Sequence, residues 1–295
     1  MIDLRRLEAL VALHRTGSVS AAAAALHYGQ PTISHHLRRL EAETGAVLLQ
    51  RVGRGVRLTP EGLLLARRGE EVLGLLGRAE AELAAATSLQ AGRVRLAAFP
   101  SGAATLVPDA LALLATRHPG IDLELTEAEP PEAYELLRAG NVDLALTFAY
   151  PDQPEPDQIT SVPVLDDPLH LVERAGADTP VDTPVDLGAL AEDDWIAGCE
   201  RCRRELLALC ADAGFTPAIA FASDDYVAVQ SLVAAGLGVT VLPGLVLRAH
   251  QHPGVASRRL AAHRRVQLST YGAPPRPAAV DAVAAALGEV ALRTA

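Results

Sequence analysis

"HYGQPTISHHLRRLEAETG", residues 27–45, predicts a tight turn followed by a helix. Gly29 permits the turn, and Pro31 suits the first helical position because its fixed backbone angle matches a helix. The helix is expected to run to about Thr44, where Gly45 ends it. A tight turn between this helix and an earlier one would make a helix-turn-helix.

The two faces of this predicted helix differ in chemistry. At about 100° per residue, Ile33, Leu37 and Leu40 share an apolar face, and His36 lies beside it, partly buried. The opposite side is mostly polar and carries Pro31, His35, Arg38, Arg39 and Ala42, with Thr32 and Ser34 on the flanks. Arginine and histidine donors beside small hydroxyl residues are what a helix needs to read base edges in the DNA major groove. A merely solvated face is the alternative, but the neighbouring elements favour DNA.

Those neighbouring elements complete a winged helix-turn-helix. Apolar residues at helical spacing predict a helix over residues 4–16, which Gly17 ends. Ser18 or Ser20 can cap a second, alanine-rich helix. Residues 47–59 then read as two short strands joined by a glycine-rich turn, which predicts a β-wing.

Charge is distributed unevenly along the 295 residues. Residues 1–68 contain ten Arg and five Asp or Glu, whereas the whole chain has a formal net charge of −10. A basic N-terminal module on an acidic body suits a nucleic-acid reader with a separate second function. Hydrophobic residues make up 49% of the chain, no run is long enough to span a membrane, and the N-terminus does not resemble a signal peptide. We therefore expect a globular, cytoplasmic protein.

A long helix is predicted from residue 60 to about Leu89, because Thr59, Pro60 and Glu61 combine a cap, a first-position proline and a first-turn acid. Small and apolar residues repeat along it with spacings of four and three, as in a heptad seam: Leu65, Gly69, Val72, Leu76, Ala79, Leu83 and Ala86. The seam predicts dimerisation through residues 59–91. The alternative is a single helix that packs on its own domain.

Residues 92–295 alternate predicted strands and helices, which is typical of βαβ units and a parallel sheet. Strands are expected at 93–99, 122–127, 142–148, 159–165, 168–174, 218–222, 238–243 and 264–271. The chain should cross between two α/β lobes near residues 161–163 and again near 265–268, which leaves a cleft for a ligand. The predicted domains are a DNA-binding domain (1–58), a linker helix (59–91) and a regulatory domain (92–295), with lobe I at about 92–161 and 268–295 and lobe II at about 162–267.

Residues 1–65 resemble the winged helix-turn-helix of the LysR-type transcriptional regulators. Besides the alanine-rich helix, the matching positions are Gln30-Pro31, Ile33-Ser34, Leu40-Glu41, Gly45, Leu48, Arg51, Arg54 and Leu58-Thr59. The rest of the chain is similar to the same family, which has a linker helix and a two-lobed α/β effector domain like a type 2 periplasmic binding protein. Two positions depart from the family: Leu49 replaces the usual Phe, and Gly29 replaces a frequent Ser, which removes a possible hydroxyl cap.

The resemblance implies a sequence-specific, DNA-binding transcriptional regulator controlled by a small-molecule effector in the cleft. Such a protein would form a dimer and assemble further into a tetramer, bind an imperfect inverted repeat in a promoter, and contact RNA polymerase if it is an activator. The residues it places on DNA are Gln30, Pro31, Thr32, Ser34, His35, Arg38, Arg51 and Arg54. We expect Thr32 and His35 to read bases, and Ser34 and the arginines to position the protein on phosphates. We expect no cofactor and no enzymatic activity.

Candidate effector-binding residues follow several strands of the regulatory domain. Ser101 and Gly102 open the helix after its first strand, where a helix N-terminus suits an anionic group, although Ser101 could simply be a cap. The other candidates lie at strand ends that should face the same cleft: Phe148, Ala149, Cys199, Glu200, Arg201, Ser223 and Asp224. These residues do not identify the ligand.

The three cysteines, Cys199, Cys202 and Cys210, allow three interpretations. The favoured one is reduced, inert or ligand-lining thiols. The second is redox sensing, because a Cys-x-x-Cys at a helix start beside arginines can have a lowered thiol pKa, and peroxide-sensing LysR-type regulators carry redox cysteines in a similar region. The third is metal binding, which is disfavoured because there is no second Cys pair to complete a closed zinc site.

Two other classes of protein compete with the regulator. The Trp195–Cys202 stretch superficially resembles thioredoxin, which would make the chain a thiol oxidoreductase, but the motif lies two-thirds along a long chain rather than after the first strand of a short domain. Alternatively, the N-terminal helices could pair only with other proteins. Salt-sensitive binding to DNA distinguishes that possibility from a regulator.

Overall fold

The computed structural model describes residues 2–52, 55–87, 92–150, 156–176, 185–272 and 276–294. The N-terminal domain has the predicted order of elements, namely α1 (Leu4–Thr16), α2 (Val19–Ala25), α3 (Gln30–Thr44), β1 (Leu49–Val52) and β2 (Gly55–Leu58). The two strands pair antiparallel and form the wing. The predicted winged helix-turn-helix is therefore confirmed.

Local signals set the ends of these helices. Ser18, rather than Ser20, caps α2 and accepts a hydrogen bond from the N–H of Ala21 at 3.1 Å. Gly17 and Gly45 end α1 and α3 with φ of 73° and 67°, a left-handed conformation that costs glycine little. Each helix therefore ends at a glycine, which can adopt the left-handed conformation because it has no Cβ.

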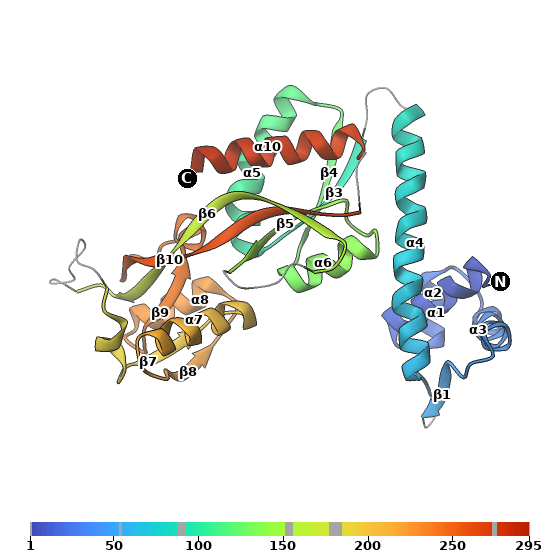
Figure 1. Ribbon diagram of the computed structural model, residues 1–295, viewed down its shortest axis with the longest axis horizontal. Coiled ribbons are helices and arrows are strands. Elements are labelled where there is room, and N and C mark those ends of the chain that lie inside the picture. The colour runs from blue at the N-terminus through green and yellow to red at the C-terminus, as the bar shows by residue number, and fades with distance from the viewer. Residues whose placement is uncertain are drawn as a thin grey trace.

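The linker helix α4 spans Pro60–Thr87, and its predicted continuation to Leu89 lies outside the described residues. Thr59 caps it and also attaches it to the wing. Its hydroxyl accepts from the N–H of Gly62 at 3.0 Å and donates to the carbonyl of Val47 at 2.7 Å. In Figure 1, α4 is one long rod with the N-terminal domain at its start and the effector domain alongside it. None of the described helices is both long and apolar enough to cross a membrane.

The effector domain is built on a six-stranded sheet in the order β4-β3-β5-β10-β6-β9. Its first half is the predicted βαβ succession of β3 (Gly92–Ala98), α5 (Pro100–Arg117), β4 (Ile121–Glu127), α6 (Pro130–Arg138) and β5 (Leu144–Ala149). β3 runs parallel to both β4 and β5. The sheet as a whole is mixed rather than parallel, because β10 (Val255–Tyr271) pairs antiparallel with β5 and with β6 (Ile159–Arg174).

The prediction of two separate strands at 159–165 and 168–174 was wrong. The structure has the single 16-residue strand β6, and β10 begins at Val255, well before the expected residue 264. Pro163 and Pro168 suggested breaks because proline cannot donate to a sheet. Register shifts in the β10–β6 pairing lie next to both prolines, opposite Gln267 and His263, so bulges accommodate the missing donors. This long strand pair carries the sheet from one lobe into the other.

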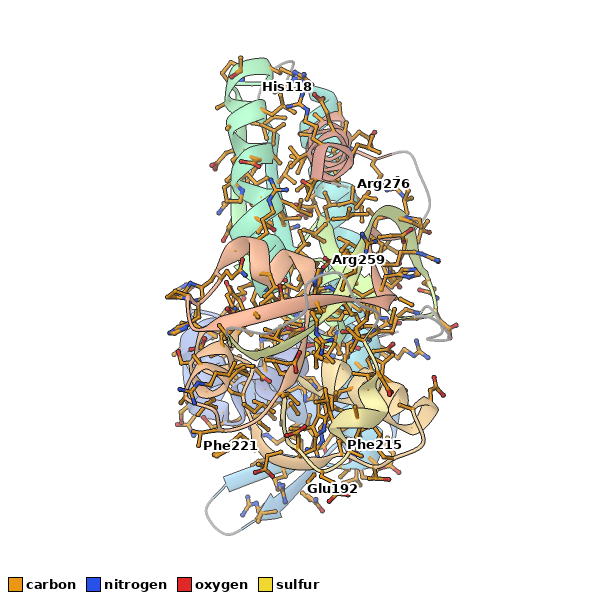
Figure 2. All side chains as sticks on the ribbon, turned by 90° about the vertical axis from the view of Figure 1, so that its left-hand side faces the viewer. His118, Glu192, Phe215, Phe221, Arg259 and Arg276 are labelled. Carbon is orange, nitrogen blue, oxygen red and sulfur yellow. The ribbon has the colours of Figure 1, made fainter. Side chains whose placement is uncertain are left out.

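The second lobe is smaller and is assembled around the far ends of β6 and β10. It contains the 3-10 helix η1 (Leu187–Leu190), β7 (Asp194–Ala197), α7 (Glu200–Asp212), β8 (Ala218–Ala222), α8 (Tyr226–Ala234), β9 (Thr240–Pro243) and α9 (Gly244–Ala249). β9 joins the edge of the six-stranded sheet, whereas β7 and β8 form a separate parallel pair. The closing helix α10 (Ala278–Thr294) packs with α5 on the first lobe. Figure 2 shows His118 at the end of one lobe, Phe215 and Phe221 in the other, and Arg259 on β10 between them.

Candidate nucleic-acid interface and interlobe pocket

Helix α3 presents the two faces that the sequence predicts. Ile33, Leu37 and Leu40 are no more than 2% exposed and pack with the cores of α1 and α2. His36 is half-buried against the ring of Tyr28. The outward side contains the expected polar residues: Gln30, Pro31, Thr32, His35 and Arg38 are exposed, and Ser34 is half-buried. The arrangement leaves one polar edge of α3 exposed to solvent.

The N-terminus of α3 offers few free backbone donors to a phosphate group. Its cap residue is Gly29, which makes no side-chain hydrogen bond to the first turn. The first N–H groups of a helix lack partners within the helix, and the helix dipole favours an anion there. Here Pro31 has no N–H, and the N–H groups of Thr32 and Ile33 donate to the carbonyl of Gly29 at 3.0 and 3.3 Å, so few backbone donors of this turn are free.

The wing is held to α3 by Glu41, a contact that sequence reasoning did not identify. One carboxylate oxygen of Glu41 accepts hydrogen bonds from the N–H groups of Leu48 and Leu49 at 2.9 and 3.1 Å. Of the wing arginines, Arg51 on β1 is exposed, and Arg54 lies outside the described residues. Glu41 thus fixes where Arg51 stands relative to the exposed edge of α3.

The predicted seam of α4 divides into two parts. At Gly69 it lies against α1, so closely that an added Cβ would approach Leu7 and Val11 to within 3 Å. Further along, Val72, Leu76 and Leu83 are 47%, 42% and 68% exposed. The start of the seam is therefore buried within the chain, whereas Val72, Leu76 and Leu83 form an apolar stripe that is exposed to solvent.

A pocket between the two lobes brings together four of the nine predicted effector residues. Ser101, Cys199, Ser223 and Asp224 line it, and its volume is about 50 Å³. The other five lie outside the lining. Gly102 and Phe148 are buried in the core of the first lobe, Ala149 ends β5, Glu200 is exposed on α7, and Arg201 donates to the carbonyl of Phe148 at 3.3 Å.

The pocket also contains residues that sequence reasoning missed, above all Arg264 from β10 and Glu129 from the start of α6. The rest of its wall is mostly apolar: Phe99, Pro100, Tyr226, Val229, Val241, Leu242, Pro243 and Val246. Arg264 is buried and its neighbour Arg265 is exposed. No local pattern in the sequence predicts which of the two arginines is buried. Glu129 carried a weak signal, because it follows the predicted strand at 122–127 and immediately precedes two prolines, which suit the start of a helix.

Arg264 is the centre of a buried polar network. Its Nε donates to Asp167 at 2.8 Å and its Nη2 donates to Ser101 at 2.9 Å, while Asp167 also accepts from the N–H of Leu245 at 2.9 Å. The guanidinium carbon lies 4.8 and 4.5 Å from the ring centres of Phe99 and Phe148. Burial alone would lower the pKa of Arg264, but the charge and hydrogen bond of Asp167, together with the nearby Tyr150 and Cys202, raise it overall. Arg264 therefore stays charged beside the pocket.

Glu129 is half-buried and places its carboxyl group at the pocket. Its Oε2 is inaccessible to solvent and has no hydrogen-bond partner among the described residues. Burial raises its pKa, and the nearby charges of Arg264 and Asp224 act in opposite directions. A carboxyl group in this position can serve a ligand as acceptor or, when protonated, as donor.

Cys199 and Cys202 face each other across the first turn of α7. The Cys199 thiol donates to the sulfur of Cys202 at 3.1 Å, and the hydroxyl of Tyr150 donates to the same sulfur at 3.5 Å. These donors and the charge of Arg264 lower the pKa of Cys202, whereas donation to Cys202 and burial raise the pKa of Cys199. Cys210 is fully buried in the second lobe, and burial raises its pKa to about 11. Among the described residues, no group of three or more Cys, His, Asp or Glu is placed to hold a metal ion.

Comparison with known families agrees with this architecture. Residues 4–63 match the bacterial regulatory helix-turn-helix of the lysR family, and residues 87–292 match the LysR substrate binding domain. The chain therefore belongs to the LysR family, whose members are DNA-binding transcriptional regulators with an effector-binding domain. The predicted fold class and function are confirmed at this level.

Individual relatives extend over nearly the whole chain. An uncharacterized HTH-type transcriptional regulator, YcgK of Bacillus subtilis, is 28% identical over 93% of this chain and 87% of its own length. A hydrogen peroxide-inducible genes activator of Pectobacterium carotovorum is 28% identical over 86% and 84%. Among solved structures, full-length OxyR from Pseudomonas aeruginosa has a TM-score of 0.71 at 24% identity, covering 97% of this chain and 95% of its own. CbnR complexed with its target DNA has a TM-score of 0.66 at 23% identity, covering 98% and 99%.

Proposed function

We propose that this regulator binds promoter DNA as a homodimer joined along α4, with one α3 helix in the major groove of each half-site of an imperfect inverted repeat. The observation that carries the proposal is the polar edge of α3, which is open while the opposite apolar face is fully buried. Thr32 and His35 are proposed to read base edges, and Ser34, Arg38, Arg51 and Arg54 to bind phosphates. CbnR, which shares this fold, has been solved in complex with its target DNA, and that complex supports binding of DNA by the fold.

Several further features of the proposal follow from promoter binding. The dimers would associate into a tetramer, and an activating form would contact RNA polymerase. A protein that acts on promoters works where the chromosome is, so we place it in the cytoplasm. We assign it no enzymatic activity and no cofactor. Thiol oxidoreductase activity in particular is disfavoured, because Cys199 and Cys202 line a narrow pocket between the lobes rather than an exposed surface that could accept a protein disulfide. Reduction of a disulfide substrate by the purified protein would contradict that assignment.

Arg38→Ala is expected to weaken binding to all DNA sequences alike and to lower the slope of log K against log salt by roughly one, because one phosphate contact is lost. The measurement is fluorescence anisotropy with labelled DNA from the upstream region of its own gene, at several salt concentrations. Arg293→Ala, an exposed arginine of α10, is the matched control and should leave the slope unchanged. An unchanged slope in Arg38→Ala removes Arg38 from the phosphate contacts. Wild-type binding that is insensitive to salt and sequence would contradict the function itself.

A small molecule in the interlobe pocket is proposed as the effector. Polar groups from both lobes, including Ser101 and Asp224, converge there beside an apolar wall. The volume of about 50 Å³ is well below the roughly 300–1,000 Å³ of typical ligand pockets. A ligand of several atoms therefore requires the lobes to separate, and it can shift the protein toward that state only by binding it more tightly than the closed one.

Redox control is the second candidate function, favoured by the 3.1 Å separation of the Cys199 and Cys202 sulfurs. The Cys202 thiolate would attack the terminal oxygen of a small hydroperoxide and break its O–O bond to give a sulfenic acid. The departing oxygen would take up a proton and leave as an alcohol or water. The Cys199 thiol would then attack the sulfenic sulfur and release water, leaving a disulfide. The name of the peroxide-inducible relative supports this candidate. Cys210 lies eleven residues beyond Cys199 in α7, about 16 Å along the helix, too far for a direct bond.

Mild peroxide treatment is expected to join Cys199 to Cys202 if this second candidate is correct. Mass spectrometry of peptides identifies the bond, and anisotropy reports the accompanying change in DNA affinity. Cys202→Ser should abolish both effects, whereas Cys210→Ser should retain them. If no Cys199–Cys202 or Cys199–Cys210 disulfide forms and DNA affinity stays constant, the redox function is rejected and the inert or ligand-lining interpretation stands.

A further inference from the structure

Helix α6 touches two functional parts of the chain at its two ends. Its N-cap residue is Glu129, which lines the interlobe pocket with a buried, unpartnered Oε2. Beyond its last residue, Arg138, the chain turns at Ala139 and Gly140 against the middle of the linker helix α4. Figure 1 shows α6 pointing from the sheet toward α4. At nine residues the helix is about 13 Å long, so it bridges the pocket and the linker directly.

The contact with α4 is made by backbone atoms. A Cβ placed on Gly74 of α4 would lie 2.6 Å from the carbonyl carbon of Ala139 and 2.7 Å from the oxygen of Arg138. A Cβ on Gly140 would lie 2.7 Å from the Cα of Gly74, and Gly140 has a φ of +64°. Both glycines are therefore needed for this approach, since no side chain fits between the two segments.

α6 is also a stiff connection between these two sites. Its Ala133, Tyr134 and Leu137 are buried in a small apolar cluster on the sheet. A packed helix of this kind responds to a push at one end by sliding as a unit rather than by bending. A displacement of Glu129 in the pocket is thus passed to the segment that rests on Gly74.

We infer that α6 is the element through which the interlobe pocket acts on the linker helix, with Glu129 as the end that senses the pocket and the Gly74–Gly140 contact as the end that moves α4. This inference rests on the proposed effector pocket. Because α4 begins at the wing and contacts α1, a shift of α4 alters the position of the α3 helix that reads DNA. The coupling is reciprocal, so DNA bound to α3 changes the affinity of the pocket for its ligand by the same factor.

The test uses Gly74→Ala, which separates α6 from α4, and Gly77→Ala as its matched control. Gly77 lies one turn further along α4, and a Cβ there would meet nothing within 4 Å. The probe that fills the pocket is methyl methanethiosulfonate, which adds a methylthio group to Cys199, in full-length protein carrying Cys202→Ser so that one pocket thiol reacts. Hydrogen exchange read by mass spectrometry reports the protection of amides 70–78 and 138–142.

Before modification, Gly74→Ala is expected to exchange faster than Gly77→Ala in both segments. Modification of Cys199 should then change exchange in these segments by about fivefold or more in the parent and in Gly77→Ala, and should leave Gly74→Ala unchanged. Equal baseline exchange in the two glycine variants, an equal response in both, or no response in the parent would each overturn the inference. Because DNA is absent throughout, these results are independent of whether the protein binds a promoter.

Discussion

Replacing Arg264 by Ala is expected to lower the free energy of unfolding of the effector domain by about 3–5 kcal/mol. The substitution leaves the Asp167 carboxylate, which is 2% exposed, buried without its cation. It also removes the hydrogen bond to Ser101 and the contacts of the guanidinium with two aromatic rings. The loss is large because the buried Asp167 carboxylate keeps only the N–H of Leu245 as a partner, and no cation then offsets the cost of its burial.

Urea unfolding followed by the fluorescence of Trp195, the single and fully buried tryptophan, measures this loss within the effector domain. Arg93→Ala is the matched control, because Arg93 and Glu124 form an ion pair whose side chains are 66% and 51% exposed. Exposed pairs contribute about 0–1 kcal/mol. The double variant Arg264→Met with Asp167→Leu should recover much of the stability, since both buried charges are then removed. Equal losses in Arg264→Ala and Arg93→Ala would show that the buried network does not stabilise the domain.

Replacing Leu76 by Glu is expected to convert the proposed dimer into a monomer. Leu76 lies in the exposed apolar part of the α4 seam with Val72 and Leu83, where two copies of the helix would meet. A buried, unpaired carboxylate at that interface is strongly unfavourable. Because a monomer occupies one half-site instead of two, affinity for an inverted repeat should fall by roughly two orders of magnitude or more.

Sedimentation velocity gives the state of assembly, and anisotropy with the inverted-repeat DNA gives the affinity. Leu292→Glu is the control, because Leu292 is 76% exposed on α10, away from the linker helix. It should sediment and bind DNA like the wild type. If Leu76→Glu remains a dimer with unchanged affinity, the exposed stripe of α4 is not the dimer interface.

The winged helix-turn-helix and the start of the linker helix were predictable from the sequence because their signals are local. Gly17, Gly45 and the Thr59-Pro60 pair act on the turn in which they stand, and they end or start helices where expected. The faces of α3 follow from the spacing of Ile33 and Leu40 alone. In such segments the helical period decides which side chains are buried.

Tertiary structure alone decided the make-up of the pocket. Arg264, Asp167 and Ser101 come from β10, β6 and α5, and only the pairing of two long strands and the docking of α5 bring them together. The prolines of β6 predicted a break in the strand. The structure has a continuous strand instead, because bulges in the β10–β6 pairing accommodate both prolines. The approach of Gly74 to Gly140 likewise joins segments that have no shared pattern in the chain. Sequence patterns report the period of one element, whereas the burial of a charge or the closeness of two backbones depends on how separate elements pack.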